Sequence, residues 1–350
     1  MSNAPAALRE IAARVDARLT SFLAAERGRW TAFDADLSVV FDELERMVVG
    51  GGKRLRPGFT HCGFVGAGGK PDDPRIVDAG AAFELLHAFA LFHDDIMDGS
   101  VTRRGSTTTH ESMQAEHRAR SWAGDARRFG DGAAILIGDL SFVYSDMLLA
   151  GLGARGWQMW NELRVELNVG QYLDMLGSAQ NERRPEKAAR ICRYKSGKYT
   201  IERPLHLGAL LADENTGLLN AYSAYGLPLG DAFQLRDDVL GVFGESSVTG
   251  KPVGDDLREA KPTPLMALAL QLATPAQRGV LEQVGQSTLS AADIAAVQQA
   301  IVDSGALNEM ESTITRLTDE AISAIKQAPV STEVKDRLTE LAHFVSDRRV

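Results

Sequence analysis

The chain has 350 residues, 44% of them hydrophobic, and a formal net charge of −9 at pH 7. This composition supports a sizeable buried core and argues against nucleic acid as a partner. Cys62 and Cys192 are the only cysteines, too few for a disulfide framework or a zinc site. No run of 18 apolar residues occurs, and residues 1–18 read as an amphipathic helix without the apolar core of a signal peptide. We therefore expect a cytoplasmic protein with no membrane span.

Apolar residues recur with a helical period along the whole chain, and no β-alternation of useful length appears. We therefore predict an all-α protein in which residues 1–350 form a single domain. Pro204 and Pro228 fall inside helical patterns and predict kinks or breaks there. The predicted helices are 6–26, 37–49, 57–67, 75–97, 132–149, 156–177, 185–201, 205–211, 217–243, 264–272, 291–303, 307–325 and 332–346.

The segment from Gly50 to Pro57 is a break in the helical pattern that reads Gly-Gly-Gly-Lys-Arg-Leu-Arg-Pro. Glycines allow backbone amides to approach an anion, and Lys53 and Arg56 add charge and a bidentate fork for phosphate oxygens. The glycine spacing is not that of a P-loop, and the segment follows a helical pattern where a P-loop would follow a strand. An ordinary surface loop is the alternative to an anion-binding one.

Two acidic motifs follow apolar helical stretches. The first is Asp94-Asp95-Ile96-Met97-Asp98, and the second is the shorter pair Asp237-Asp238. Asp94 and Asp98 stand at i and i+4, which places their side chains on one helix face about 6 Å apart. Such clusters are often solvated helix ends, but carboxylates at the ends of buried helices are costly unless ions or donors compensate them. Two such faces meeting in one cavity would hold several divalent ions around a diphosphate.

Basic residues gather near these motifs although the protein is negative overall, which is a pattern for an anionic ligand. They are Lys53, Arg54, Arg56, Arg103, Arg104, Lys195, Lys198, Lys251 and Lys261.

With these motifs in place, the chain resembles the trans-isoprenyl diphosphate synthases of the polyprenyl synthetase family, in the family's order from about Val49 to Thr263. The resemblance implies an isoprenoid-synthase helical bundle around a central deep cavity, and a homodimer formed through packed helices. The segments that carry it are Gly51–Pro57, Asp94–Asp98, Arg103–Gly105, Gly170–Asp174, Lys195–Gly197, Phe233–Asp238, Thr249–Pro252, Gly254–Asp256 and Lys261.

The activity implied by the resemblance is a head-to-tail prenyl transfer. An allylic diphosphate (dimethylallyl, geranyl or farnesyl) ionises, and the carbocation is attacked by the double bond of isopentenyl diphosphate. Loss of a proton then gives an allylic product five carbons longer. Metal ions and fixed cations in a dry site stabilise the departing diphosphate best, and the resemblance implies three Mg²⁺ ions.

The resemblance also assigns roles to individual residues. Asp94 and Asp98 should bind two Mg²⁺ ions and Asp237 the third, with Asp95 and Asp238 orienting ligands and lysines behind them. The expected allylic diphosphate ligands are Arg103, Lys195 and Lys251, and the expected isopentenyl diphosphate ligands are Lys53, Arg56, His87 and Arg104. Further polar liners of the cavity are expected to be Gln171, Gln234, Asp174 and, from the last loop, Lys261.

Product length depends in this family on side chains beneath the first acidic motif. Phe89 and Ala90 lie five and four residues before Asp94, about one helical turn below the metals. A single aromatic there resembles the enzymes that make twenty carbons, so we expect geranylgeranyl diphosphate, with farnesyl diphosphate as the alternative. Leu86 or a neighbouring helix is the alternative floor of the pocket.

The second acidic motif departs from the family pattern, because Gly241 stands where many members carry a third aspartate. Asp237 must then act without a partner at i+4.

A class I terpene cyclase would need a second metal-binding motif of Asn, Ser or Thr, and Glu, each four residues apart. Asn308 and Ser312 match its first two positions, but Arg316 stands where the Glu is required. Squalene or phytoene synthases would not be expected to contain the segment Gly51–Pro57. A noncatalytic partner subunit would be expected to have lost metal ligands, and both acidic motifs keep their leading pair.

Overall fold

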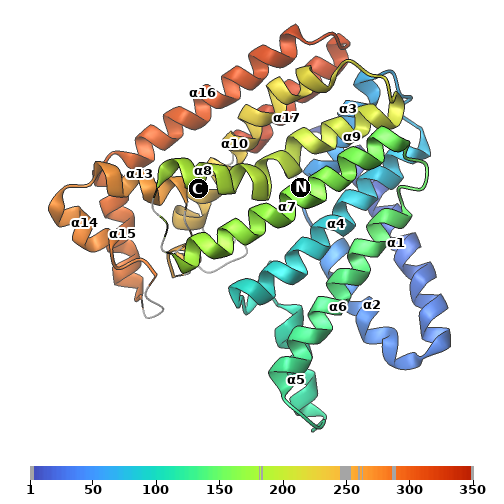
Figure 1. Ribbon diagram of the computed structural model, residues 1–350, viewed down its shortest axis with the longest axis horizontal. Helices are drawn as coiled ribbons and strands as arrows, with labels where there is room; N and C mark the ends of the chain where they lie inside the picture. The colour runs from blue at the N-terminus through green and yellow to red at the C-terminus, as the bar shows by residue number, and fades with distance from the viewer. Residues whose placement is uncertain are drawn as a thin grey trace. The chain divides into compact units, whose positions relative to one another are not determined.

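The computed structural model describes residues 4–180, 182, 184–244, 254–258, 261, 263–285 and 289–347. Its described part is helical apart from a short antiparallel hairpin (Figure 1), so the prediction of an all-α fold is confirmed. The chain divides into two compact units, Met1–Gly156 with Leu207–Asn215, and Trp157–His206 with Thr216–Val350. The prediction of a single domain stays a prediction.

The first unit contains the N-terminal helices and the hairpin. Its elements are α1 (Ala6–Phe33), η1 (Ala35–Leu37), α2 (Ser38–Val49), α3 (Leu55–Gly66), α4 (Pro74–Asp98), β1 (Thr102–Arg103), β2 (Ser106–Thr107), α5 (Thr109–Ala119) and α6 (Ala126–Met147).

The second unit contains most of the remaining elements, and α9 runs from it into the first. They are α7 (Ala154–Ala179), α8 (Pro185–Cys192), the π-helix η2 (Arg193–Glu202), α9 (Arg203–Ala212), α10 (Leu219–Phe243), α12 (Asp255–Arg258), α13 (Pro264–Leu272), α14 (Pro275–Leu281), α15 (Ala291–Asp303), α16 (Ala306–Gln327) and α17 (Thr332–Ser346).

Helix α4 is the central element of the first unit. It begins at Pro74, where the side chain of Asp73 caps the first turn, and it ends at Asp98. The next residue, Gly99, caps this end with a φ of 64°, a left-handed conformation suited to glycine. It packs against α1, α3 and α6. A Cβ on Gly80 would lie 2.9 Å from Val15 and 3.2 Å from Pro57, so glycine allows α1 and α3 to approach α4 closely.

By length and composition α4 could cross a membrane, but 61% of its apolar window is buried inside the protein. Burial to this extent is typical of the core helix of a globular unit.

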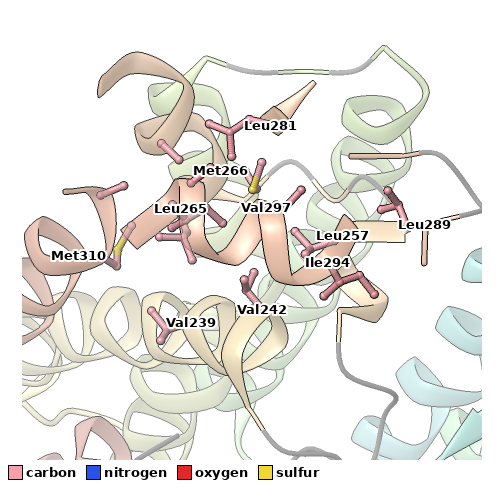
Figure 2. Close-up of a cluster of buried hydrophobic side chains, with 14 of the residues drawn as sticks. Val239, Val242, Leu257, Leu265, Met266, Leu281, Leu289, Ile294, Val297 and Met310 are labelled. Carbon is pink, nitrogen blue, oxygen red and sulfur yellow. The ribbon is translucent and has the colours of Figure 1, made fainter. Parts of the chain in front are cut away.

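In the second unit, α10 packs against η2, α16, α17 and α13. The C-terminal turns of α10 are fixed by an apolar cluster, in which Val239 and Val242 lie with Leu265 and Met266 of α13 and with Ile294 of α15 (Figure 2). Since Asp237 and Asp238 directly precede Val239, the cluster holds the second acidic motif on a rigid helix.

Several predicted elements need correction. The predicted helix 185–201 is an α-helix only to Cys192, after which the backbone continues as the π-helix η2. Helix α5 was not predicted, because its buried face is mostly polar and consists of Thr109, His110, Met113, Gln114 and His117. The helix boundary near Pro204 is present, whereas α10 is assigned as one helix through Pro228.

Candidate functional site

The predicted site residues fall into the two units. Those of the first unit are Lys53, Arg56, Leu86, His87, Phe89, Ala90, Asp94, Asp95, Asp98, Arg103 and Arg104, and those of the second are Gln171, Asp174, Lys195, Gln234, Asp237, Asp238, Lys251 and Lys261. Lys251 lies outside the described residues, and Lys261 is half-buried.

The loop between α2 and α3 has an unusual backbone. Gly51 and Gly52 have φ of 109° and 146°, and Arg54 has φ of 51°. Glycine adopts the first two conformations without steric cost, whereas an arginine with positive φ needs compensation from its surroundings. The chain turns sharply here, so that Arg54 is buried while Lys53 is exposed and Arg56 is half-buried.

Arg54 is held by three acceptors from three helices. Its guanidinium donates to Asp16 of α1 at 2.7 Å, to Glu84 of α4 at 2.5 Å and to the carbonyl of Val48 at 2.7 Å. Burial by itself lowers the pKa of Arg54, but Glu84 and Asp16 raise it above its ordinary value. The contacts of Arg54 were not predicted from the sequence. The available signal was Glu84, an acid within an apolar stretch that had to find a buried base.

His87 lies one turn beyond Glu84 on α4 and is half-buried. Loss of water around the ring lowers its pKa well below the ordinary value, and the charges of Arg56, Arg104, Arg103 and Arg54 lower it further. Arg104 also donates to the carbonyl of Gly51 at 2.6 Å. The structure thus brings together Arg56, His87 and Arg104, which are three of the predicted isopentenyl diphosphate ligands.

The first acidic motif forms the last turn of α4. Asp95 is buried, while Asp94 and Asp98 are half-buried. Arg103, on the hairpin strand β1, donates to Asp95 at 2.6 Å and contacts Asp94 at 3.5 Å. The hairpin therefore returns a positive charge to the carboxylates, which reduces the repulsion among them. The predicted role of Arg103 as a diphosphate ligand stays a prediction.

The carboxylate pair suits a divalent ion that arrives with a phosphate ligand. Among the described residues, no three histidine, cysteine, aspartate or glutamate side chains converge as a metal cage would require. Asp94 and Asp98 supply two hard oxygen donors from one helix turn, and Mg²⁺ in phosphate-handling sites uses one or two carboxylates together with substrate phosphates and water. These residues therefore fit Mg²⁺ bound jointly with a diphosphate.

The predicted floor of the product pocket is aromatic. The centroid of the Phe89 ring lies 4.7 Å from the ring centroid of Phe142 on α6 and 4.7 Å from that of His93. Leu86 is fully buried and Ala90 half-buried. Phe142 was not predicted, because its spacing from the acidic motif depends on how α6 packs against α4.

In the second unit, Lys195 and Asp174 form an ion pair with Nζ 2.6 Å from Oδ2. On α10, Gln234 donates to Asp238 at 3.0 Å, and Asp237 is half-buried. Burial and the charges of Asp238 and Asp174 raise the pKa of Cys192 well above its ordinary value, so this thiol is protonated at neutral pH.

Arg236, next to Asp237, makes structural contacts. It donates to both carboxylate oxygens of Glu311 on α16 at 2.6 Å and to the carbonyl of Ser346 on α17 at 2.8 Å. These bidentate and backbone contacts join α10 to the C-terminal helices, so that the acidic motif on α10 has a fixed support.

The model of the family described as polyprenyl synthetase matches residues 38–302 of the chain. The chain belongs to this family. This polyprenyl synthetase is 32% identical over 326 residues to a geranylfarnesyl diphosphate synthase of Aeropyrum pernix, a match that covers 89% of this chain and 96% of that one. It is also 30% identical over 308 residues to a (2E,6E)-farnesyl diphosphate synthase of Mycobacterium tuberculosis, covering 85% of this chain and 80% of that one.

Among solved structures, it is similar to the geranylgeranyl pyrophosphate synthase from Corynebacterium glutamicum complexed with isoprenyl diphosphate and magnesium. The TM-score is 0.92 and the identity 38%, with 98% of this chain and 99% of that chain covered. This polyprenyl synthetase is therefore a trans-prenyltransferase with the isoprenoid-synthase fold, of a family that depends on Mg²⁺. The names of these relatives give three different product lengths.

Because its pKa is lowered, we expect the His87 ring to be neutral at pH 7 and to titrate below free histidine, whose pKa is about 6.5. Arg56→Gln should raise the pKa of His87, since it removes the neighbouring charge that lowers it most. NMR titration of labelled histidine would measure both, with His87→Gln to identify the signal. The unfolded chain binds this proton more readily, so His87 favours unfolding as pH falls below the unfolded pKa. A His87 pKa at or above that of free histidine would contradict this account.

Proposed function

We propose that this polyprenyl synthetase condenses isopentenyl diphosphate with an allylic diphosphate head-to-tail. The observation that carries the proposal is the carboxylate pair Asp94 and Asp98 at the end of a buried helix whose preceding turns present a neutral histidine among arginines. Carboxylates bring metal ions, and arginines bind phosphate oxygens with paired donors. A noncatalytic subunit would not need both the metal-binding carboxylates and the phosphate-binding arginines.

The reaction breaks the bond between the allylic carbon and its diphosphate oxygen, and the electron pair leaves with the diphosphate. The double bond of isopentenyl diphosphate then attacks the allylic cation, and loss of a proton forms the new double bond. Mg²⁺, when bound, neutralises the charge that develops on the departing diphosphate. The chain's own task is to hold both diphosphates and to exclude water from the cation.

We assign the diphosphates as the motifs indicate. Lys53, Arg56, His87 and Arg104 hold isopentenyl diphosphate, and a neutral His87 can donate one hydrogen bond to it. Asp94, Asp98 and Asp237 bind three Mg²⁺ ions, with Asp95 and Asp238 behind them. Arg103, Lys195 and Lys251 hold the allylic diphosphate, and the remaining polar liners are Gln171, Asp174, Gln234 and Lys261.

The experiment that tests this function is an incubation of the protein with Mg²⁺, labelled isopentenyl diphosphate and an allylic diphosphate. We expect turnover that EDTA abolishes and Mg²⁺ restores. Asp94→Ala, Asp98→Ala and Asp237→Ala should each lower kcat by orders of magnitude without loss of helical circular dichroism, because each removes charge stabilisation at the leaving group. Wild-type protein that binds diphosphates without any turnover would overturn the proposal in favour of a noncatalytic subunit. Normal turnover in Asp237→Ala would exclude the proposed third Mg²⁺ ion.

For the product we propose geranylgeranyl diphosphate, with twenty carbons. The contact of Phe89 with Phe142 supports a closed pocket floor about one turn below Asp94. Ala90 next to Phe89 leaves room that a second aromatic ring would take up, and this favours twenty carbons over fifteen.

Phe89→Ala should deepen the pocket and shift the products toward twenty-five carbons or more, read by chromatography of the dephosphorylated products. Phe142→Ala should shift them in the same direction, because it removes the other half of the ring contact. Phe89→Tyr keeps the ring and serves as the control, with an unchanged product. If Phe89→Ala leaves the distribution unchanged, the floor lies elsewhere.

We further propose that the protein acts in the cytoplasm as a homodimer, and that α6 contributes the dimer surface. Phe129, Leu136, Val143 and Met147 are 40%, 69%, 53% and 47% exposed. Their spacing of seven, seven and four residues places them along one face of α6, the pattern by which two helices pack together. A contiguous apolar stripe of this kind is a feature of protein interfaces.

Leu136→Glu should convert the dimer to a monomer, because it places a charge in the middle of the apolar stripe. Light scattering coupled to gel filtration would measure the mass. Phe33→Glu is the matched control, since Phe33 is 80% exposed at the end of α1, outside the stripe, and should leave the mass unchanged. A wild-type monomer, or a dimer that Leu136→Glu does not affect, would refute this surface.

A further inference from the structure

The π-helix η2 carries Lys195 and is enclosed by backbone on two sides. A Cβ on Gly170 of α7 would lie 2.4 Å from the backbone nitrogen of Lys195, and a Cβ on Gly230 of α10 would lie 2.7 Å from the carbonyl oxygen of Gly197. These distances exclude any side chain at either glycine without movement of η2. Backbone therefore packs directly on backbone, which fixes how far η2 lies from α7 and α10.

Side chains of α7 hold η2 on both sides of Gly170. Glu166, Gly170 and Asp174 stand at i, i+4 and i+8 and so share one face of α7. Asp174 accepts from Lys195, as described above. Glu166 accepts from Lys198 of η2 and, through both carboxylate oxygens, from Arg203 at 2.8 and 2.7 Å.

The Glu166 cluster is buried and well satisfied. The Glu166 side chain is 8% exposed, and those of Lys198 and Arg203 are 13% and 15% exposed. Burial raises the pKa of Glu166, but hydrogen bonds from Arg203 and Lys198 bring it below its ordinary value, so the carboxylate is charged. A buried carboxylate that accepts two hydrogen bonds from one arginine restricts the movement of both side chains, because neither can exchange its partner for water.

We propose that Glu166 is a positioning residue for Lys195. By holding Lys198 and Arg203, which lie within and directly after η2, it fixes the register of this wide helix against α7 and thereby the direction in which Lys195 projects. This inference rests on the proposed role of Lys195 at the allylic diphosphate. π-Helical segments occur frequently at functional sites, where the extra residue redirects a side chain at a cost that neighbouring contacts must offset.

Three further contacts, all made by Glu202, support this role for the cluster. Lys198 also lies 3.9 Å from Glu202 at the end of η2, and the hydroxyl of Ser223 on α10 donates to Glu202 at 2.6 Å. A Cβ on Gly226 of α10 would lie 2.8 Å from the Cα of Glu202. The end of η2 is thus fixed to both α7 and α10, so that its other end, which carries Lys195, has a defined orientation.

The test is a double-mutant cycle of Glu166→Gln with Lys195→Ala, with radiolabelled product as the readout. In the wild-type background, Glu166→Gln should lower kcat/KM for the allylic diphosphate by on the order of 10- to 100-fold, because a displacement of about 1 Å costs this much. The KM for isopentenyl diphosphate should not change. In the Lys195→Ala background, Glu166→Gln should have no further effect, because there is no longer an ammonium group to position.

Glu182→Gln is the matched control. Glu182 also accepts from two bases, Arg184 and Lys187, but these lie at the start of α8, and the variant should keep wild-type kinetics. If Glu166→Gln does not fold, Arg203→Lys replaces it in the cycle, since lysine keeps the charge and loses the bidentate fork. Hydrogen exchange of the amides of residues 193–202 should rise in either variant.

Equal losses in both backgrounds, or equal losses for both substrates, would reduce Glu166 to a stabilising residue and overturn the inference. Unchanged hydrogen exchange in η2 would do the same. An inactive wild-type protein would instead refute the proposed function, so the two failures are distinguishable.

Discussion

The concentration of charge along one buried helix is the constraint on which the first unit depends. Over its last four turns, α4 changes from an apolar core helix to a row of ionisable side chains at Glu84, His87, Asp94, Asp95 and Asp98. Each of these would be costly in a helix of the core unless a counter-charge or ligand compensated it. Arg54 compensates Glu84, and Arg103 compensates the first two aspartates.

The remaining charge determines what this end of α4 can bind. Arg56 and Arg104 surround His87, whose pKa is lowered. The histidine is therefore neutral at neutral pH, and the positive potential of this region comes from the arginines. Two turns further along α4, beginning at Asp94, the carboxylates give the opposite potential. An arginine-rich region next to a carboxylate pair suits phosphate oxygens on the first and a metal ion on the second. The second unit meets a similar demand differently, by fixing Lys195 on a π-helix between glycines of α7 and α10.

Much of this could be predicted from the sequence, because the relevant signals are local. Helical periodicity gave the bounds of α13, α15 and α17 as they are in the structure. The glycines at Gly51 and Gly52 and the i, i+4 aspartates are patterns with a direct steric or metal-binding meaning. The partners of long-range contacts were not predictable, because nothing local relates Arg54 to Asp16, or Phe89 to Phe142.

Helix α5 and the π-helix η2 were not predicted, for physical reasons. Helix α5 lacks an apolar stripe because its buried face uses histidine, threonine and glutamine, so periodicity could not find it. The π-helix η2 follows α8 without a proline or glycine at the junction to mark the change. The tight backbone packing of η2 against Gly170 and Gly230 is a tertiary feature that local sequence does not show.

We propose that Asp94 and Asp98 bind Mg²⁺ jointly with a diphosphate. The decisive experiment is isothermal titration of the protein with inorganic diphosphate, with and without Mg²⁺. We predict that Mg²⁺ alone gives little heat, that diphosphate binds much more tightly when Mg²⁺ is present, and that Asp98→Ala removes this difference. Tight binding of Mg²⁺ without diphosphate, or a diphosphate affinity that does not depend on Mg²⁺, would contradict the account.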